Sequence, residues 1–183
     1  MAERRRRAGE PRQPPDASQA LDIAAHFLGT RPRTEWELMR RLRRAGATDE
    51  VIEGTLARLR ELGLADDLAF ARWWAEQRDR HAPRGRRLLE TELRQRGVPR
   101  DVLEELRTEE IAEPVLDTGG LPATELERAR IALDRHLRGR SLPADRAALQ
   151  RIGMFLVRRG FDPQTARDAI RQLGAEEDDP EDG

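Results

Sequence analysis

Apolar residues recur at a helical spacing along most of this chain, and glycine or proline separates the periodic stretches. Positions three and four residues apart, such as Leu38 and Leu42, lie on one face of an α-helix and predict a buried side. Thr34 is a typical helix start, while Gly46 and Pro83 are typical stops. No segment predicts a β-strand, so we expect an all-α protein. The nine predicted helices cover residues 18–28, 34–46, 48–63, 66–80, 84–97, 99–111, 123–137, 143–159 and 163–173.

Three stretches of the chain repeat one pattern, which becomes visible when Gly46, Gly97 and Gly160 are aligned. Each glycine follows an apolar helix face and precedes a second amphipathic run. The aligned apolar residues are Leu38, Leu89 and Ile152, eight positions before the glycine, and Leu42, Leu93 and Leu156, four positions before it. Repeats of this size stack mainly on their neighbours. We therefore predict three tandem three-helix modules that form an elongated, curved array.

Three segments outside the predicted modules lack helical periodicity. We place the modules at residues 18–63, 64–112 and 123–174. Residues 1–17 are basic and proline-rich, residues 113–122 contain prolines and glycines typical of a linker, and residues 175–183 carry six acidic side chains. Such polar compositions bury too little apolar surface to order a segment. We expect the two terminal segments to be disordered tails.

Composition narrows the protein class. The 183 residues include 34 basic and 35 acidic side chains, and every basic one is an arginine. The absence of cysteine excludes disulfides, zinc–thiolate sites and a thiol nucleophile. No apolar stretch is long enough for a membrane span, and the first residues lack the apolar core of a secretory signal. We therefore expect a soluble cytoplasmic protein with thin cores. The i,i+4 ion pairs expected to support its helices are Glu37–Arg41, Glu90–Arg94 and Glu92–Arg96.

Positive charge is gathered in corresponding helices of the first two modules. Residues 31–44 carry six arginines and two acids, residues 78–100 carry eight arginines and three acids, and residues 104–127 are strongly acidic. Either cluster can be an ordinary solvated face. It can also bind a partner, because arginine pairs with carboxylates and phosphates. The candidate partner-binding residues are Arg31, Arg33, Trp36, Arg40, Arg43, Arg44, Arg84, Arg86, Arg87 and Arg94.

A sharper motif joins two predicted helices of the second module. Phe70 and Trp74 share a helix face, which favours an aromatic core over a binding surface. Gly85 permits close packing at the start of the next helix, and Gly97 is a typical left-handed helix end. Neighbouring acids without further ligands at suitable spacing do not predict a metal site. The residues of this structural motif are Asp66, Asp67, Phe70, Trp74, Gly85, Leu89, Leu93 and Gly97.

These residues lie in segments that resemble the RecX family of recombination regulators: LADDLAFARWWAEQR, PRGRRLLETELRQRGV and RIGMFLVRRGF. The segment RTEWELMRRLRRAG fits that family's opening module, so the resemblance covers residues 18–173. It implies an elongated arc of three-helix repeats that lies in the helical groove of the RecA recombinase filament. It also implies suppression of ATP hydrolysis, strand exchange and co-protease activity, with effects on recombination, DNA repair and the SOS response. The resemblance implies a monomeric regulator without catalytic activity or cofactor, which can make weak contact with single- or double-stranded DNA.

Two other functions are compatible with the same surfaces. A helix-turn-helix-like nucleic-acid-binding protein would place Arg40, Arg43, Arg44 and Arg94 on phosphates, although residues 18–174 carry a net charge of only about +3. A generic helical-repeat adaptor would bind another protein. An enzyme is not expected, because the three histidines are far apart in sequence and no nucleotide-binding or hydrolase motif occurs.

Overall fold

The computed structural model describes residues 13–112 and 124–178. Within those ranges the chain forms nine α-helices and no β-strand, which confirms the predicted all-α class. The chain divides into two compact units, Met1–Asp66 and Asp67–Gly183. None of the described helices is long and apolar enough to cross a lipid bilayer. The predicted linker, residues 113–122, and the ends of both predicted tails lie outside the described residues.

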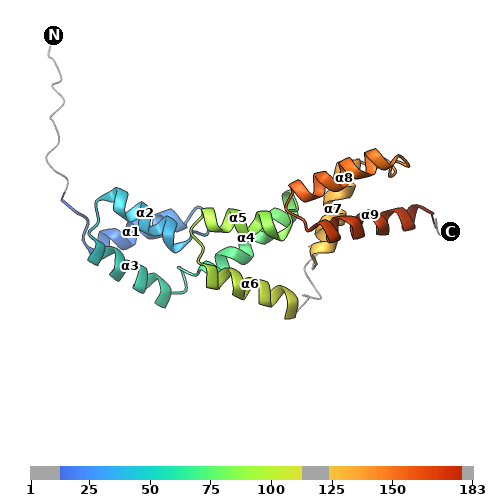
Figure 1. The fold of residues 1–183 in the computed structure, drawn as a ribbon. Coiled ribbons are helices and arrows are strands. Elements are labelled where there is room, and N and C mark those ends of the chain that lie inside the picture. Colours follow the sequence, from blue (N-terminus) through green and yellow to red (C-terminus); the bar gives the residue numbers. More distant parts are fainter. Residues whose placement is uncertain (1–12, 113–123, 179–183) are drawn as a thin grey trace, which may run out of the picture. The chain divides into compact units, whose positions relative to one another are not determined.

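Residues 13–66, the described part of the first unit, form three helices around one apolar core (Figure 1). They are α1 (Ala17–Leu28), α2 (Glu35–Ala45) and α3 (Asp49–Glu61). Each begins after a polar residue whose side chain accepts a main-chain N–H of the first turn, namely Asp16, Thr34 or Thr48. The buried core residues are Ala20, Ala24, Leu38, Leu42, Ile52, Leu56, Leu59 and Ala65. Alanines on α1 allow the other two helices to approach it closely.

In the second unit, residues 67–112 and 124–178 form two further groups of three helices, each with its own core (Figure 1). The helices are α4 (Asp67–His81), α5 (Arg86–Gln95), α6 (Arg100–Ala112), α7 (Glu125–Leu137), α8 (Arg146–Arg158) and α9 (Pro163–Asp178). The core of α4–α6 consists of Phe70, Ala71, Trp74, Ala75, Leu89, Leu93, Val98, Leu103 and Leu106. The core of α7–α9 consists of Ala129, Ala132, Leu133, Leu137, Ile152, Leu156, Phe161, Ala166 and Ala169. Each apolar core is thus built by three consecutive helices.

The glycines that align the sequence repeats share one backbone conformation. Gly46, Gly97 and Gly160 have φ angles of 89°, 85° and 90°, which glycine adopts without the steric cost of a side chain. They follow the ends of α2, α5 and α8. The six apolar residues aligned with them, four and eight positions earlier, are all buried. The repeated sequence pattern therefore corresponds to a repeated helix–glycine–helix unit.

Main-chain atoms join the second and third groups of helices at Gly85. Its N–H donates to the Arg159 carbonyl at 3.0 Å. A Cβ atom at Gly85 would lie 2.2 Å from both the Gly160 carbonyl carbon and the Phe161 nitrogen. Such an approach excludes any side chain at this position. The close packing predicted for Gly85 thus occurs, but against a segment 75 residues away in the sequence.

The start of α8 differs from the predicted one. The helix begins at Arg146 and not at Pro143, because the Asp145 side chain accepts two main-chain N–H groups of the first turn. An acceptor of this kind is a strong helix start. Residues 138–145 consequently form a connection whose side chains are available to line a cavity.

The end of α9 also differs from the prediction. The helix continues to Asp178, four residues beyond the predicted end of the third module. Glu176 in this extension pairs with Arg130 of α7 at 2.7 Å. Part of the acidic segment thus contributes to the described structure.

Candidate partner-binding surface

The first basic cluster lies on α2 and on the turn before it, and two of its arginines contact their own unit. Arg31 Nη2 donates to Glu37 Oε1 at 2.9 Å. The Arg33 guanidinium lies over the Phe27 ring, 3.9 Å from its centre, and donates to the Phe27 carbonyl. Both side chains therefore stabilise the connection between α1 and α2, and neither offers a freely accessible charge.

Four other residues of this cluster form what we call the α2 basic face: Trp36, Arg40, Arg43 and Arg44. The Arg40 guanidinium lies 4.3 Å from the centre of the Trp36 ring. Arg43 pairs with Asp49 at 3.1 Å, yet its side chain stays 56% exposed. An exposed pair of this kind contributes about 1 kcal/mol or less, so a partner's carboxylate or phosphate can replace it.

The second basic cluster is organised around Glu92 of α5. Its carboxylate accepts from the Trp74 indole Nε1 at 2.9 Å and from Arg78 Nε at 2.8 Å, and it pairs with Arg84. Two guanidinium groups contact the Trp74 ring, that of Arg96 at 3.7 Å and that of Arg78 at 4.4 Å from the ring centre. Glu92 thus ties the aromatic core of α4 to the charges around it.

Burial lowers the pKa of two arginines near Glu92, and neighbouring positive charge adds to the effect for one of them. Burial lowers the pKa of Arg78. Burial has the largest effect on the pKa of Arg84, and the charges of Arg78 and Arg159 lower it further. Arginine remains protonated at neutral pH despite such shifts, so the Glu92 carboxylate compensates several cations. This network stabilises the second unit and holds the partly exposed Arg84 side chain against Glu92.

The remaining predicted residues of the second cluster also make contacts within the second unit. Arg87 pairs with Asp162 at 3.1 Å, and Arg94 pairs with Glu90 at 2.9 Å. The main-chain N–H of Arg86 donates to a glutamate at the start of α7. Arg87 and Arg94 remain largely exposed, but a carboxylate accompanies each of them.

The two basic clusters, equivalent in sequence, therefore differ in the structure. In residues 31–44 both acids lie in the first turn of α2, away from the arginines at its end, of which Arg43 pairs with the exposed Asp49 of α3. In residues 78–100, Glu90 and Glu92 lie in the middle of α5 and accept from the surrounding arginines. The position of the acids along each helix is the sequence signal for this difference. We retain the α2 basic face as the candidate partner-binding surface.

A third basic segment, residues 135–159, lies in the third module, whereas the charge clusters predicted from the sequence lie in the first two modules. It carries seven arginines and a single acid, Asp145. A running count of charge along the whole chain finds it. The segment includes the connection between α7 and α8, part of which the sequence pattern assigned to a helix.

These surfaces offer guanidinium groups, which form strong hydrogen bonds with carboxylates and phosphates. In residues 13–112 and 124–178, no three His, Asp or Glu side chains are grouped in a way that could hold a metal ion. The arginines of these surfaces are thus suited to bind carboxylates or phosphates of another macromolecule.

Two models of one protein family match this chain. The model of the first three-helix domain of RecX matches residues 20–59, and that of the second three-helix domain matches residues 66–106. These spans correspond closely to α1–α3 and α4–α6.

Individual relatives extend the similarity along the chain. Regulatory protein RecX of Prosthecochloris aestuarii is 37% identical over 159 residues, which cover 86% of this chain and 95% of the relative. Regulatory protein RecX of Mycolicibacterium smegmatis is 33% identical over 181 residues, which cover 91% of each chain. A crystal structure of RecX from Lactobacillus salivarius has the same fold, with a TM-score of 0.72 over 87% of this chain and 97% of that chain at 18% identity.

Proposed function

Since this chain belongs to the RecX family of regulatory proteins, we propose that it regulates the RecA recombinase. It binds the filament that RecA forms on DNA, lies in the helical groove of that filament, and inhibits ATP hydrolysis, strand exchange and co-protease activity. The observation that carries the proposal is the 37% identity to a regulatory protein RecX over 95% of that relative's length. Because the match covers nearly the whole relative, we propose the same regulatory role for this chain.

We assign the contact with RecA to the α2 basic face. Arginine and tryptophan are the residues most enriched at the energetic centres of protein interfaces. The Trp36 ring holds the Arg40 guanidinium in place, which reduces the conformational entropy lost on binding. Arg43 and Arg44 add exposed charge at the end of the same helix. Carboxylates on the partner would complement this face.

The first expected result is inhibition of the single-stranded-DNA-dependent ATPase of RecA. A chain that lies along a filament contacts several subunits, so we expect inhibition at fewer than one copy of this protein per RecA. The measurement is the steady-state ATPase rate while the protein is titrated. An unchanged rate at equimolar protein, with helical content intact by circular dichroism, would contradict the proposal and would favour an adaptor for another partner.

The second expected result concerns the combined substitution of Arg40→Ala, Arg43→Ala and Arg44→Ala. The concentration for half-maximal inhibition of RecA should rise at least about tenfold, because loss of a single energetically central arginine of an interface costs about 2 kcal/mol or more. Stability should change little, because all three side chains are exposed. The measurements are the ATPase titration and thermal unfolding by circular dichroism.

A matched control for this variant combines Arg58→Ala, Arg100→Ala and Arg167→Ala. These arginines are also exposed, and the net charge changes by the same amount. We expect this control to inhibit RecA like the parent chain. Equal weakening in both variants would show that overall charge, and not the α2 basic face, determines inhibition.

A further inference from the structure

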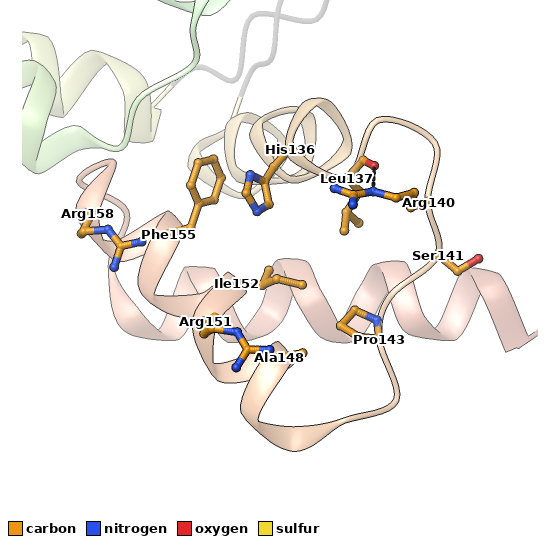
Figure 2. A pocket seen from close by; sticks show the side chains of 10 residues that line it. All are labelled: His136, Leu137, Arg140, Ser141, Pro143, Ala148, Arg151, Ile152, Phe155 and Arg158. Carbon is orange, nitrogen blue, oxygen red and sulfur yellow. Dashed lines mark hydrogen bonds between the residues drawn. The ribbon is translucent and has the colours of Figure 1, made fainter.

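A cavity of about 430 Å³ opens between the α7–α8 connection and α8 (Figure 2). Ile152, together with other apolar side chains, forms part of its lining. His136 and Phe155 stand beside one another at one side. Arg140 reaches it from the α7–α8 connection, and Arg151 and Arg158 reach it from α8. We propose that this hollow, which we call the α8 pocket, binds single-stranded nucleic acid.

A neighbouring hollow extends the same surface toward α4. Its volume is about 490 Å³, and it shares His136, Arg140 and Phe155 with the α8 pocket. Arg138 and Arg159 contribute further positive charge there. Among the described residues that line either hollow there is no aspartate or glutamate. The combined surface therefore favours an extended anionic ligand.

The charge of this surface is not neutralised within the described part of the chain. None of the seven arginines in residues 135–159 forms an ion pair there. Arg140 donates to the Leu137 carbonyl and Arg159 to the Pro83 carbonyl. A carbonyl carries no net charge, so each guanidinium keeps its full positive charge for a ligand. The nearby acid Asp145 instead accepts main-chain N–H groups at the start of α8.

The order of residues on α8 fits a strand of alternating phosphates and bases. Arg151, Phe155 and Arg158 are spaced at i, i+4 and i+7, so an aromatic ring lies between two cations about 10 Å apart along the helix axis. The His136 ring is stacked on Phe155 with their centres 3.9 Å apart, and the Arg159 guanidinium lies 5.1 Å from the Phe155 ring centre. Proteins that bind single strands combine such a basic groove with aromatic rings on which bases stack.

Two other ligand classes fit this arrangement less well. An acidic peptide would satisfy the arginines but would leave the aromatic pair without a planar partner. A duplex keeps its bases stacked on one another, so its phosphates alone would reach the pocket. Unpaired bases expose faces that can stack on the exposed His136 ring, which the Phe155 ring supports from its other side.

The test measures binding of a fluorescent oligothymidylate of about fifteen nucleotides, near the upper site size of single-strand-binding folds. Fluorescence anisotropy is recorded over a range of salt concentrations. The combined substitution of Arg151→Ala and Arg158→Ala should weaken binding at least about tenfold. It should also reduce the slope of log affinity against log salt by about 1.4, because each phosphate contact to a single strand contributes about 0.7.

A second variant, Phe155→Leu, keeps an apolar side chain but removes the ring. We expect it to weaken binding about tenfold, the size of one base-stacking contact, because His136 loses the ring that holds it in place for a base. Its salt dependence should stay unchanged, because no charge is removed. The matched control combines Arg167→Ala and Arg171→Ala on α9, where both side chains are exposed and outside the pocket. This control removes the same charge and should change affinity by no more than about twofold.

Three outcomes would overturn the proposal. Equal weakening in the α9 control would indicate a general charge effect. Displacement by oligoglutamate at equal charge concentration would indicate an acidic peptide as the ligand. Displacement by thymidine monophosphate at equal nucleotide concentration would indicate a small phosphate ester and not a strand. The assay contains no RecA, so its failure is distinguishable from failure of the proposed regulation of RecA.

Discussion

A chain carrying Trp74→Ala is expected to lose about 3–5 kcal/mol of unfolding free energy, as other large aromatic truncations in cores do. The Trp74 side chain is buried and packs on Phe70, with ring centres 6.1 Å apart and nearly parallel. Its indole N–H donates to Glu92, and two guanidinium groups contact its ring. The substitution therefore removes an apolar core element and the centre of a charge network at once. Urea unfolding followed by circular dichroism measures the loss.

A companion substitution, Trp74→Phe, separates the two contributions. It keeps a ring in the core but removes the donor to Glu92, so we expect a loss of about 1–2 kcal/mol. Both variants should leave the unfolding of the α1–α3 unit unchanged, because that unit has its own core. Parent-like stability of the Trp74→Ala chain would show that the ring contributes little to the fold.

A comparable loss, about 3–5 kcal/mol, is expected for Asp79→Ala. The carboxylate of Asp79 on α4 accepts from Arg128 Nε on α7 at 3.0 Å, and the two side chains are only 7% and 9% exposed. Removing the acid leaves a buried guanidinium without this counter-charge, which is far more costly than loss of a surface ion pair. Equilibrium unfolding in urea measures the effect.

Two further variants make this result specific. The combination of Asp79→Leu with Arg128→Leu removes both charges, so it should recover most of the lost stability. The control Arg87→Ala breaks the exposed pair with Asp162 and should cost less than about 1 kcal/mol. A small effect of Asp79→Ala, similar to that of the Arg87 control, would contradict the prediction.

Local sequence information is sufficient for the helices and for their buried faces. The left-handed glycines after α2, α5 and α8 and the buried apolar residues before them form one repeated spacing. Each copy of this pattern is formed by residues that are close together in the sequence. Helix starts depend on side chains such as Thr34 and Thr48, which act within three residues. Helical period and capping both depend on residues that are close together in the chain, so a single sequence is enough to predict them.

The partners of charged side chains are not accessible in the same way. The sequence pattern offers only Arg96 as a partner of Glu92, whereas Arg78 and Arg84 from other segments pair with it in the structure. An exposed i,i+4 pair stabilises a helix by only a few tenths of a kcal/mol. A partly buried carboxylate gains more from tertiary cations and an indole N–H, so tertiary contacts determine its partners. The sequence pattern of charge therefore located the basic clusters but did not distinguish the paired one from the α2 basic face.

The connection between α7 and α8 shows a second limit. A proline at residue 143 favoured an early helix start, but the better acceptor, Asp145, begins the helix three residues later. The shift is small in sequence, yet it leaves Pro143 in a connection that lines the α8 pocket. A cavity depends on where several segments meet, and periodicity within one segment does not report that.

The peptide groups that meet at Gly85 have a bearing on how this protein can evolve. A hydrogen bond between main-chain atoms does not depend on which side chains surround it, so drift can replace neighbouring residues while the bond persists. Positions 85 and 160 must remain glycine for these segments to stay in contact, because a Cβ atom at either position would collide with the opposite segment. Lineages can thus exchange the outward-facing arginines to follow a changing partner without rebuilding the scaffold that carries them.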